Sequence, residues 1–315
     1  MKIHRPSHHQ SGLTLLELLV VLTILVVLST VAITSTSGVA DQARYEATQR
    51  TLESIRDAVI GPANLRDTDG TLLYTGFVAD TGRLPKAVAD GALLTLAELV
   101  ALPAGMSPYN VLSATEGNIV VEPPLVAADE QDSEILIGVG WRGPYLRLTP
   151  GNLLPRDGWG SDLVIPVGAD DPIDQIISYG RDGATGGADA YDADLSCEFP
   201  ESLHEAALTV QVEFRDAAGV PKAPDEMKNV VVRLFSPDAD SGKIRVKKSD
   251  PQMTPIPPAI TTLTFNFDEI APAVPLTIGQ RVIRADYDDG NKKSAPAYLM
   301  LRPGQNYRTL VITVP

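Results

Sequence analysis

One acidic residue, Glu17, stands at the head of a long apolar segment. No other charged residue follows until Asp41, and only hydroxyl-bearing side chains interrupt the run from Leu18 to Ile33. A carboxylate in hydrocarbon costs on the order of a few kcal/mol, and less near the interface, so Glu17 requires a positive partner. Cleavage after Gly12 would give Leu13 a new α-amino group. The amine of a neighbouring copy can then neutralise Glu17 when subunits pack side by side.

The residues from Gly12 to Glu17 read Gly-Leu-Thr-Leu-Leu-Glu. They resemble the processing site of type IV pilins and of type II secretion pseudopilins. The resemblance implies that prepilin peptidase cuts between Gly12 and Leu13 and methylates the new N-terminus, and that Glu17 guides subunit docking in a filament. Three positions depart from the common pattern. Leu13 replaces a more usual phenylalanine, Val26 a glycine and Thr34 a helix-kinking proline; these departures concern helix melting in the filament, not processing.

An ordinary secretory signal is the alternative interpretation, because Gly38-Val39-Ala40 offers small residues to a signal peptidase. The apolar run exceeds the roughly 7–15 residues of such signals, and Glu17 would interrupt its start. Lys2 and Arg5 precede the run, and a basic flank favours keeping that end in the cytoplasm. We therefore expect a single-pass protein of the bacterial inner membrane, with its globular part in the periplasm and its leader, residues 1–12, removed.

A second group of residues with chemical potential lies between Ser178 and Leu195, where aspartates alternate with glycines. It follows a Gly-Pro-Tyr-Leu segment at 143–146 and an Asp-Gly-Trp-Gly turn at 157–160. The order and spacing resemble the C-terminal half of the major pseudopilin of type II secretion systems, in which this loop binds one calcium ion.

The resemblance implies that calcium is held by the side chains of Asp182, Asp192 and Asp194, with Asp189 in reserve. Asp189 is included because the stretch after Gly186-Gly187 is one residue longer than usual. Backbone oxygens near Ser178, Tyr179 or Ala184 would complete the six to eight oxygens, at about 2.3–2.6 Å, that calcium takes. The alternative is a plain Asp/Gly turn, closed by side-chain-to-backbone hydrogen bonds without a metal.

The sequence offers no constellation typical of catalysis, so we expect no enzyme. Three of the four histidines lie in the leader, and His204 alone is expected at the surface of a domain junction. The single Cys197 excludes an internal disulfide, and no glycine-rich segment continues into the Lys-Ser/Thr of a phosphate-binding loop. The formal net charge of −14 opposes binding to nucleic acid.

We predict an α+β fold that begins with one long helix over residues 13–60, ended by Gly61-Pro62. Residues 13–33 form its transmembrane and assembly half, roughly 30 Å long, which matches a bilayer core. Beyond Asp41 an apolar stripe is expected to pack on the protein's own globular part. The stripe consists of Ala43, Ala47, Leu52, Ile55 and Val59.

Residues 61–200 are predicted as a small pseudopilin-type domain of loops and strands, with one further helix over Leu93–Leu102. Trp141, Tyr145 and Trp159 are expected to serve packing. A group of acids is predicted to form a solvated loop: Asp129, Glu130, Asp132 and Glu134.

Residues 203–315 alternate in hydrophobicity over about seven short runs separated by Gly, Asp and Pro turns, which predicts a β-sandwich. The predicted strands are 208–214, 230–235, 244–246, 263–267, 280–287, 298–301 and 309–314. The turn expected at 301–307, together with Ile278-Gly279-Gln280, resembles prealbumin-like or Ig-like accessory domains.

The prediction from these patterns is a structural subunit of a type II secretion pseudopilus or a related filament. Its expected partners are copies of itself through the N-terminal helices, other pseudopilins or pilins, prepilin peptidase and the inner-membrane assembly platform. Filament growth would drive protein secretion. Two alternatives stay open: a minor or tip pilin whose β-domain binds a substrate or surface, and a membrane-anchored calcium-binding protein that does not polymerise.

Overall fold

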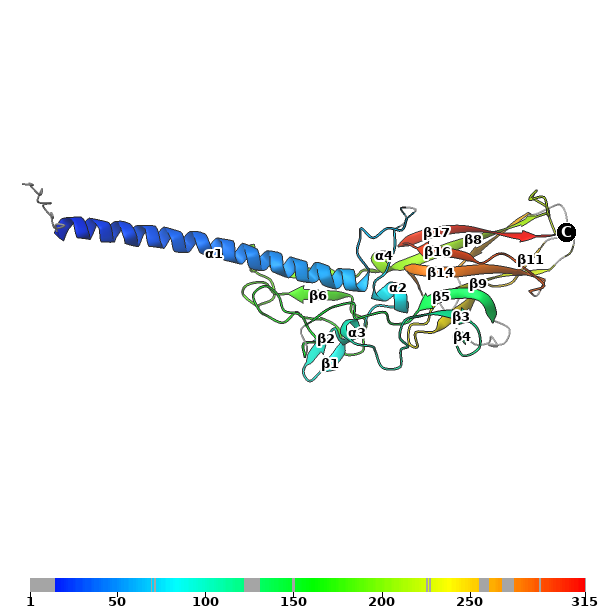
Figure 1. Cartoon of the computed structure of the whole chain (residues 1–315), viewed down its shortest axis with the longest axis horizontal. Coiled ribbons are helices and arrows are strands. Elements are labelled where there is room, and N and C mark those ends of the chain that lie inside the picture. Colours follow the sequence, from blue (N-terminus) through cyan, green and yellow to red (C-terminus); the bar gives the residue numbers. More distant parts are fainter. Residues whose placement is uncertain are drawn as a thin grey trace, which may run out of the picture.

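The computed structural model describes residues 15–68, 70, 72–121, 131–148, 151–224, 226, 228–254, 261–267, 275–288 and 290–314; the side chains of 31–37 and 121 lie outside this description. The molecule is elongated, with helix α1 extending from one end and a β-rich body at the other (Figure 1). A long N-terminal helix followed by a largely β body confirms the predicted α+β class.

Helix α1 covers Leu15–Val59 and ends where the sequence predicts, before Gly61-Pro62. Its buried face follows residues three and four apart, which share one side of a helix. This face includes Asp41 and Tyr45, which are partly covered, and Thr48, Leu52, Ile55 and Val59, which are buried. Ala43, predicted in the apolar stripe, is exposed, because a residue two positions from Asp41 points to the opposite side of the helix.

The part of the body that packs directly on α1, residues 61–200, is called the head. Its core joins Leu52, Ile55 and Val59 of α1 to Phe77, Leu96 and Ile176, among others, and Trp141 and Tyr145 pack against it as expected. The elements of the head are α2 (Phe77–Thr81), β1 (Val88–Asp90), β2 (Leu93–Thr95), α3 (Ala97–Val100), β3 (Asn110–Ala114), β4 (Ile119–Val121), β5 (Asp132–Val139), β6 (Gln175–Ser178) and β7 (Leu195–Glu198).

The helix predicted over Leu93–Leu102 is only partly correct. Leu93–Thr95 forms strand β2, which pairs antiparallel with β1 across a turn at Gly91, and only Ala97–Val100 is helical. Leu96 and Leu99 are fully buried while Leu93 is 54% exposed, so the apolar spacing reflects a hairpin followed by one helical turn.

The C-terminal part is a sandwich of two sheets, as the alternation predicts. Its elements are α4 (Glu201–His204), β8 (Glu205–Arg215), β9 (Asn229–Pro237), β10 (Ile244–Lys248), β11 (Gln252–Met253), β12 (Thr262–Asn266), β13 (Leu276–Thr277), β14 (Gly279–Tyr287), β15 (Lys292–Lys293), β16 (Ala297–Leu301) and β17 (Gly304–Thr313). The turn predicted at 301–307 is wrong from Gly304 onward, because β17 starts there and pairs in parallel with β8 over its whole length.

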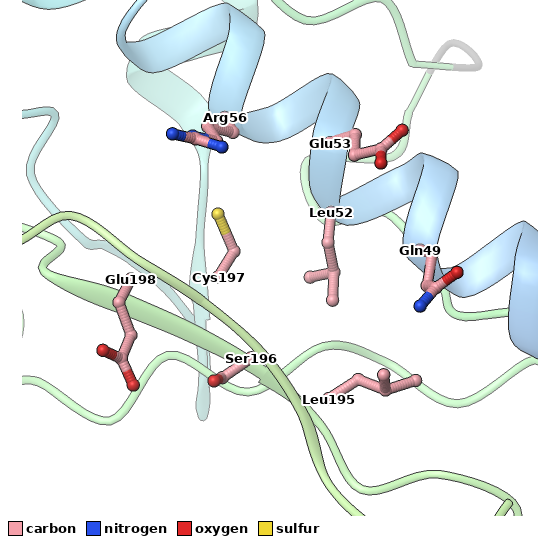
Figure 2. Close-up of a pocket in the computed structure, with 8 residues that line it drawn as sticks. All are labelled: Gln49, Leu52, Glu53, Arg56, Leu195, Ser196, Cys197 and Glu198. Atoms are coloured by element: carbon pink, nitrogen blue, oxygen red, sulfur yellow. The ribbon is translucent and has the colours of Figure 1, made fainter.

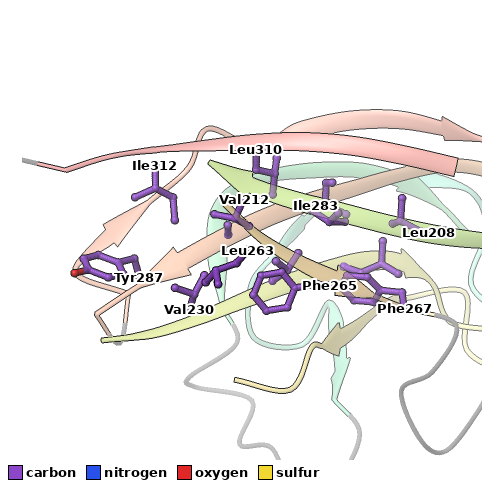
Figure 3. Packing of buried hydrophobic residues seen from close by; sticks show 14 of the residues in the cluster. Leu208, Val212, Val230, Leu263, Phe265, Phe267, Ile283, Tyr287, Leu310 and Ile312 are labelled. Atoms are coloured by element: carbon purple, nitrogen blue, oxygen red, sulfur yellow. The ribbon is translucent and has the colours of Figure 1, made fainter. Parts of the chain in front are cut away.

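The sandwich core is built from alternate residues of facing strands (Figure 3). Leu208, Val212 and Phe214 of β8 face Val230, Ile283 and Tyr287 of the other sheet, and all of them are buried. Phe214 and Tyr287 meet edge to face, with ring centroids 5.6 Å apart. This packing supplies the apolar burial that stabilises a two-sheet fold.

The larger sheet connects the sandwich to the head. Its order is β15-β14-β9-β10-β4, so β4 of the head adds a strand parallel to β10. Ile135, Ile137 and Val139 of β5 pack against Phe235 and Val246 on the face of this sheet that points away from the sandwich core. The body thus has three layers where head and sandwich meet.

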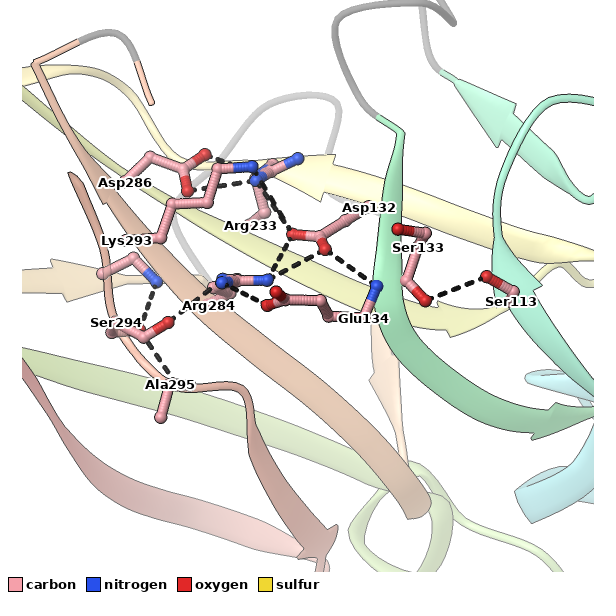
Figure 4. Close-up of polar contacts among 11 residues, drawn as sticks. Ser113, Asp132, Ser133, Glu134, Arg233, Arg284, Asp286, Lys293, Ser294 and Ala295 are labelled. Atoms are coloured by element: carbon pink, nitrogen blue, oxygen red, sulfur yellow. Dashed lines mark hydrogen bonds and ion pairs between the residues drawn. The ribbon is translucent and has the colours of Figure 1, made fainter. Parts of the chain in front are cut away.

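A buried ion network fixes this third layer (Figure 4). Arg233 and Arg284 are cross-strand neighbours on β9 and β14. Arg284 donates two hydrogen bonds, of 2.9 and 2.8 Å, to Asp132 at the start of β5, and Arg233 contacts Asp132 at 3.3 Å and Asp286 at 2.7 Å. The solvated loop predicted here is wrong for Asp132, which is 5% exposed because two arginines require its charge. Glu134 is exposed, and Asp129 and Glu130 lie outside the described residues.

Candidate assembly helix and Asp/Gly loop

The first half of α1 presents an apolar surface on all sides. Its large side chains are 46–84% exposed. They are Leu15, Leu16, Leu18, Leu19, Val20, Val21, Leu22, Ile24, Leu25, Val26, Val27 and Leu28. The hydroxyl of Thr23 donates to the carbonyls of Leu19 or Val20, and that of Thr30 to Val27, so these polar groups are satisfied within the helix. Glu17 lies in the first turn, where the positive end of the helix dipole favours a carboxylate.

The predicted cleavage site, Gly12 and Leu13, lies outside the described residues. Across the part of the chain that is described, no helix has both the length and the apolarity needed to cross a membrane.

The Asp-Gly-Trp-Gly turn docks on the second half of α1. Asp157 is buried; its Oδ1 accepts the backbone N–H groups of Trp159 and Ser161, and its Oδ2 accepts the hydroxyl of Ser178 at 2.8 Å. The N–H of Gly158 donates to Thr48 Oγ1 on the helix at 2.9 Å. Ser178, predicted near a metal, therefore has its hydroxyl committed to the turn that anchors the head.

The aspartates of the predicted calcium loop have separate partners. Asp182 accepts the N–H of Ala184 at 3.1 Å, and both oxygens of Asp194 accept the N–H of Gly186 at 3.0 Å. Asp192 is held by Arg181, whose Nε and Nη2 lie 2.8 and 3.0 Å from its two oxygens. These hydrogen bonds raise the pKa of Arg181 above its ordinary value.

This arrangement bears on the calcium prediction. Asp182 and Asp194 accept from the loop backbone, as in the metal-free turn, and Asp192 is occupied by a guanidinium. Among the described residues no group of three or more His, Cys, Asp or Glu side chains is placed to hold a metal ion. Asp189 lies 3.4 Å from Arg181, and Tyr179 and Ala184 belong to the same loop. Calcium binding stays a prediction, and no chemical step is derived from it.

Sequence reasoning missed Arg181 and Asp41, the residues that link this loop to α1. Arg181 Nη1 lies 3.3 Å from Asp41 Oδ2. Two features of the sequence could have pointed to this link. Arg181 directly precedes the aspartates of the loop, and Asp41 is the first charged residue after Glu17 in the predicted helix.

A shallow cavity of about 320 Å³ lies between α1 and β7 (Figure 2). Gln49, Leu52 and Arg56 line it from the helix, and Leu195 and Cys197 from the strand. Burial raises the pKa of Cys197 to about 11, so its thiol is neutral at pH 7 and is a poor nucleophile.

His204 lies at the junction of head and sandwich, in α4. Its predicted surface position is wrong, because it is 8% exposed, and burial lowers its pKa.

Comparison with known proteins identifies the N-terminal segment. Residues 7–33 match the family model of the prokaryotic N-terminal methylation motif. The motif is a type IV pilin-like prepilin signal, and it indicates a membrane-anchored substrate of prepilin peptidase with pilin-like polymerisation. No curated protein and no solved structure matches the chain.

Proposed function

We propose that this chain is a structural subunit of a type II secretion pseudopilus or a closely related filament. Prepilin peptidase removes residues 1–12 at the inner membrane, and the subunits then assemble through the first half of α1. The observation that carries the proposal is the exposed apolar surface of Leu15–Leu28, which continues into a helix whose second half is packed on the head.

The energetics favour a partner for this surface. Full burial of one large aliphatic side chain is worth about 1.5–3 kcal/mol, and more than ten such side chains are exposed here. Lipid covers them before assembly, and the helices of neighbouring subunits cover them in the filament.

Glu17 sets the register of the contact between the α1 helices of neighbouring subunits. In hydrocarbon a carboxylate is favoured only beside a positive charge, and processing creates one at Leu13 of each copy. Pairing between Glu17 of one subunit and the N-terminus of the next fixes how far one helix is shifted along another. Growth of such a filament from the assembly platform would push cargo toward the outer membrane.

The shape of the molecule favours a second candidate function, that of a minor or tip subunit. The sandwich extends away from the head in the direction opposite to α1 (Figure 1). In a filament whose helices run along its axis toward the membrane, this places the sandwich where the heads of the earlier subunits, nearer the tip, would stand. Only the terminal position has free space there, and a sandwich at the tip could bind a substrate or surface. The copy number relative to other pilins separates the two candidates.

The test of assembly is Glu17→Ala, with Glu17→Gln as the isosteric variant. We expect normal insertion and processing, read by an intact mass that lacks 12 residues and carries one added methyl group. Filament formation should fall, since a charge-assisted hydrogen bond is worth about 1.5–3 kcal/mol and each subunit contact would weaken roughly tenfold or more.

Glu53→Ala, at an exposed position in the second half of α1, is the matched control and should assemble normally. Normal filaments from Glu17→Ala would contradict the pairing. A mature protein that keeps residues 1–12 would contradict processing and favour a membrane-anchored protein that does not polymerise.

A further inference from the structure

Arg181 is the centre of an ion cluster that joins two elements far apart in the sequence. Its guanidinium contacts Asp189 and Asp192 within its own loop, and Asp41 on α1. The contact with Asp192 uses two parallel N–H groups, a geometry that only arginine offers to a carboxylate. One cation is thus shared by three acids from two elements.

Further contacts hold the same loop on the same turn of the helix. The hydroxyl of Tyr191 donates to Gln42 Oε1 at 3.1 Å, and its ring lies edge-on to Tyr45, with centroids 6.0 Å apart. The side chains of Asp41 and Asp192 are 17% and 19% exposed, whereas those of Arg181 and Asp189 are 39% and 74% exposed, so the cluster lies at the surface with two of its acids partly covered. The loop is therefore docked at residues 41–45, where the exposed apolar half of α1 ends.

The positions of the other acids complete the closure without an added ion. Asp182 and Asp194, at opposite ends of the loop, accept the backbone N–H groups of Ala184 and Gly186. The N–H of Arg181 donates to the carbonyl of Tyr191 at 2.8 Å. A divalent ion that bound Asp192 would compete with the guanidinium, which contacts both of its oxygens.

We propose that Arg181 is the internal cation of this loop: it closes residues 181–194 and holds them on α1, so that the ordered loop does not depend on a bound divalent ion. Arg181 is a positioning residue, which sets where the head meets the assembly half of the helix. This inference concerns the single subunit, and it holds or fails independently of the proposed filament.

The experiment uses the full chain in detergent and two readouts, thermal melting and amide hydrogen exchange of residues 186–194. The wild type is measured in EDTA and in millimolar calcium. We expect the same melting temperature and the same exchange in both, because the guanidinium is already in place. Melting that falls in EDTA and recovers with calcium would overturn the proposal.

Arg181→Gln provides the second arm. We expect the amides of 186–194 to exchange roughly tenfold faster or more. Local opening of the loop costs less free energy in this variant, because the ion pairs between Arg181 and α1 are already absent. Arg156→Gln is the matched control: Arg156 pairs with Asp162 at 3.0 Å within its own turn, and its loss should leave 186–194 unchanged. Equal exchange in the two variants would overturn the proposal. Should Arg181→Gln fail to fold, the calcium arm on the wild type still decides.

Discussion

At the scale of single residues, one carboxyl group with a raised pKa, that of Asp80, lies where α2 meets β14. Asp80 is 4% exposed, accepts the hydroxyl of Tyr145 at 2.9 Å and contacts Arg142 at 3.0 Å. Burial raises its pKa to about 6, against the lowering effects of Arg142, Tyr145 and Arg281. Arg281 is itself fully buried, donates to the carbonyl of Ala79, and has its pKa lowered to about 9 by burial. The balance of charge at this junction therefore depends on pH.

The expected consequence is a stability that declines as pH rises. A carboxyl with a higher pKa folded than unfolded holds its proton more tightly in the folded state. The stabilisation by the protonated Asp80 is complete below its ordinary pKa of 3.8 and is lost as the pH rises through about 6. Between these two pH values we expect the free energy of unfolding of the wild type to fall by on the order of 2–3 kcal/mol relative to that of Asp80→Asn.

Urea unfolding of both proteins at several pH values measures this difference. Asp162→Asn, at an exposed ion pair, is the control and should run parallel to the wild type. A constant difference between wild type and Asp80→Asn across this range would contradict the raised pKa.

At the scale of elements, the head is fastened to α1 at a few defined points, one of which requires a glycine. A Cβ at Gly158 would overlap the backbone of Arg44, because the turn lies directly against the helix. Thr48 receives the N–H of Gly158 and donates its own hydroxyl to the carbonyl of Arg44 at 3.0 Å. A side chain at this position would separate the turn from the helix.

We expect Gly158→Ala to destabilise the protein by about 1–3 kcal/mol, the usual cost of overpacking a close contact. Gly38→Ala is the matched control: it lies in α1 with no atom near its added methyl, and alanine favours the helix by roughly 0.8–1 kcal/mol. Thermal melting should thus shift in opposite directions for the two substitutions. A Gly158→Ala protein as stable as wild type would show that the turn does not lie against α1.

At the scale of the whole molecule, head and sandwich share a sheet and a charge network. Asp132 is the buried acid between Arg233 and Arg284, and β4 completes the sheet that begins in the sandwich. Both features argue that the two parts unfold together.

We expect Asp132→Asn to destabilise the whole body by about 3–5 kcal/mol, since it leaves two buried arginines short of negative charge. Fluorescence of Trp141 and Trp159, which lie in the head, and amide hydrogen exchange of β8 and β17, which lie in the sandwich, should report one coincident transition. Asp162→Asn again serves as control. Two separate transitions would contradict the coupling.

What the sequence could predict follows from how local each signal is. Helix α1 and the strands β8, β9, β14 and β17 each show a hydrophobic periodicity within their own residues, and this periodicity predicts them from the sequence. The partners of β4 and of Asp132 lie more than 100 residues further along the chain, and no local pattern marks them. The Asp/Gly loop is recognisable from its composition, but the role of Arg181 depends on a helix residue that only the folded chain brings near.

The pairing of Ile119 with Ile244 sets an order of events during synthesis of the chain. A chain that has been synthesised only as far as β8 lacks β10. Strand β4 then has no partner strand, and β5 has no sheet to pack against. Such long-range closure is slow and comes late. A nascent chain thus cannot complete its head until its last third has been synthesised.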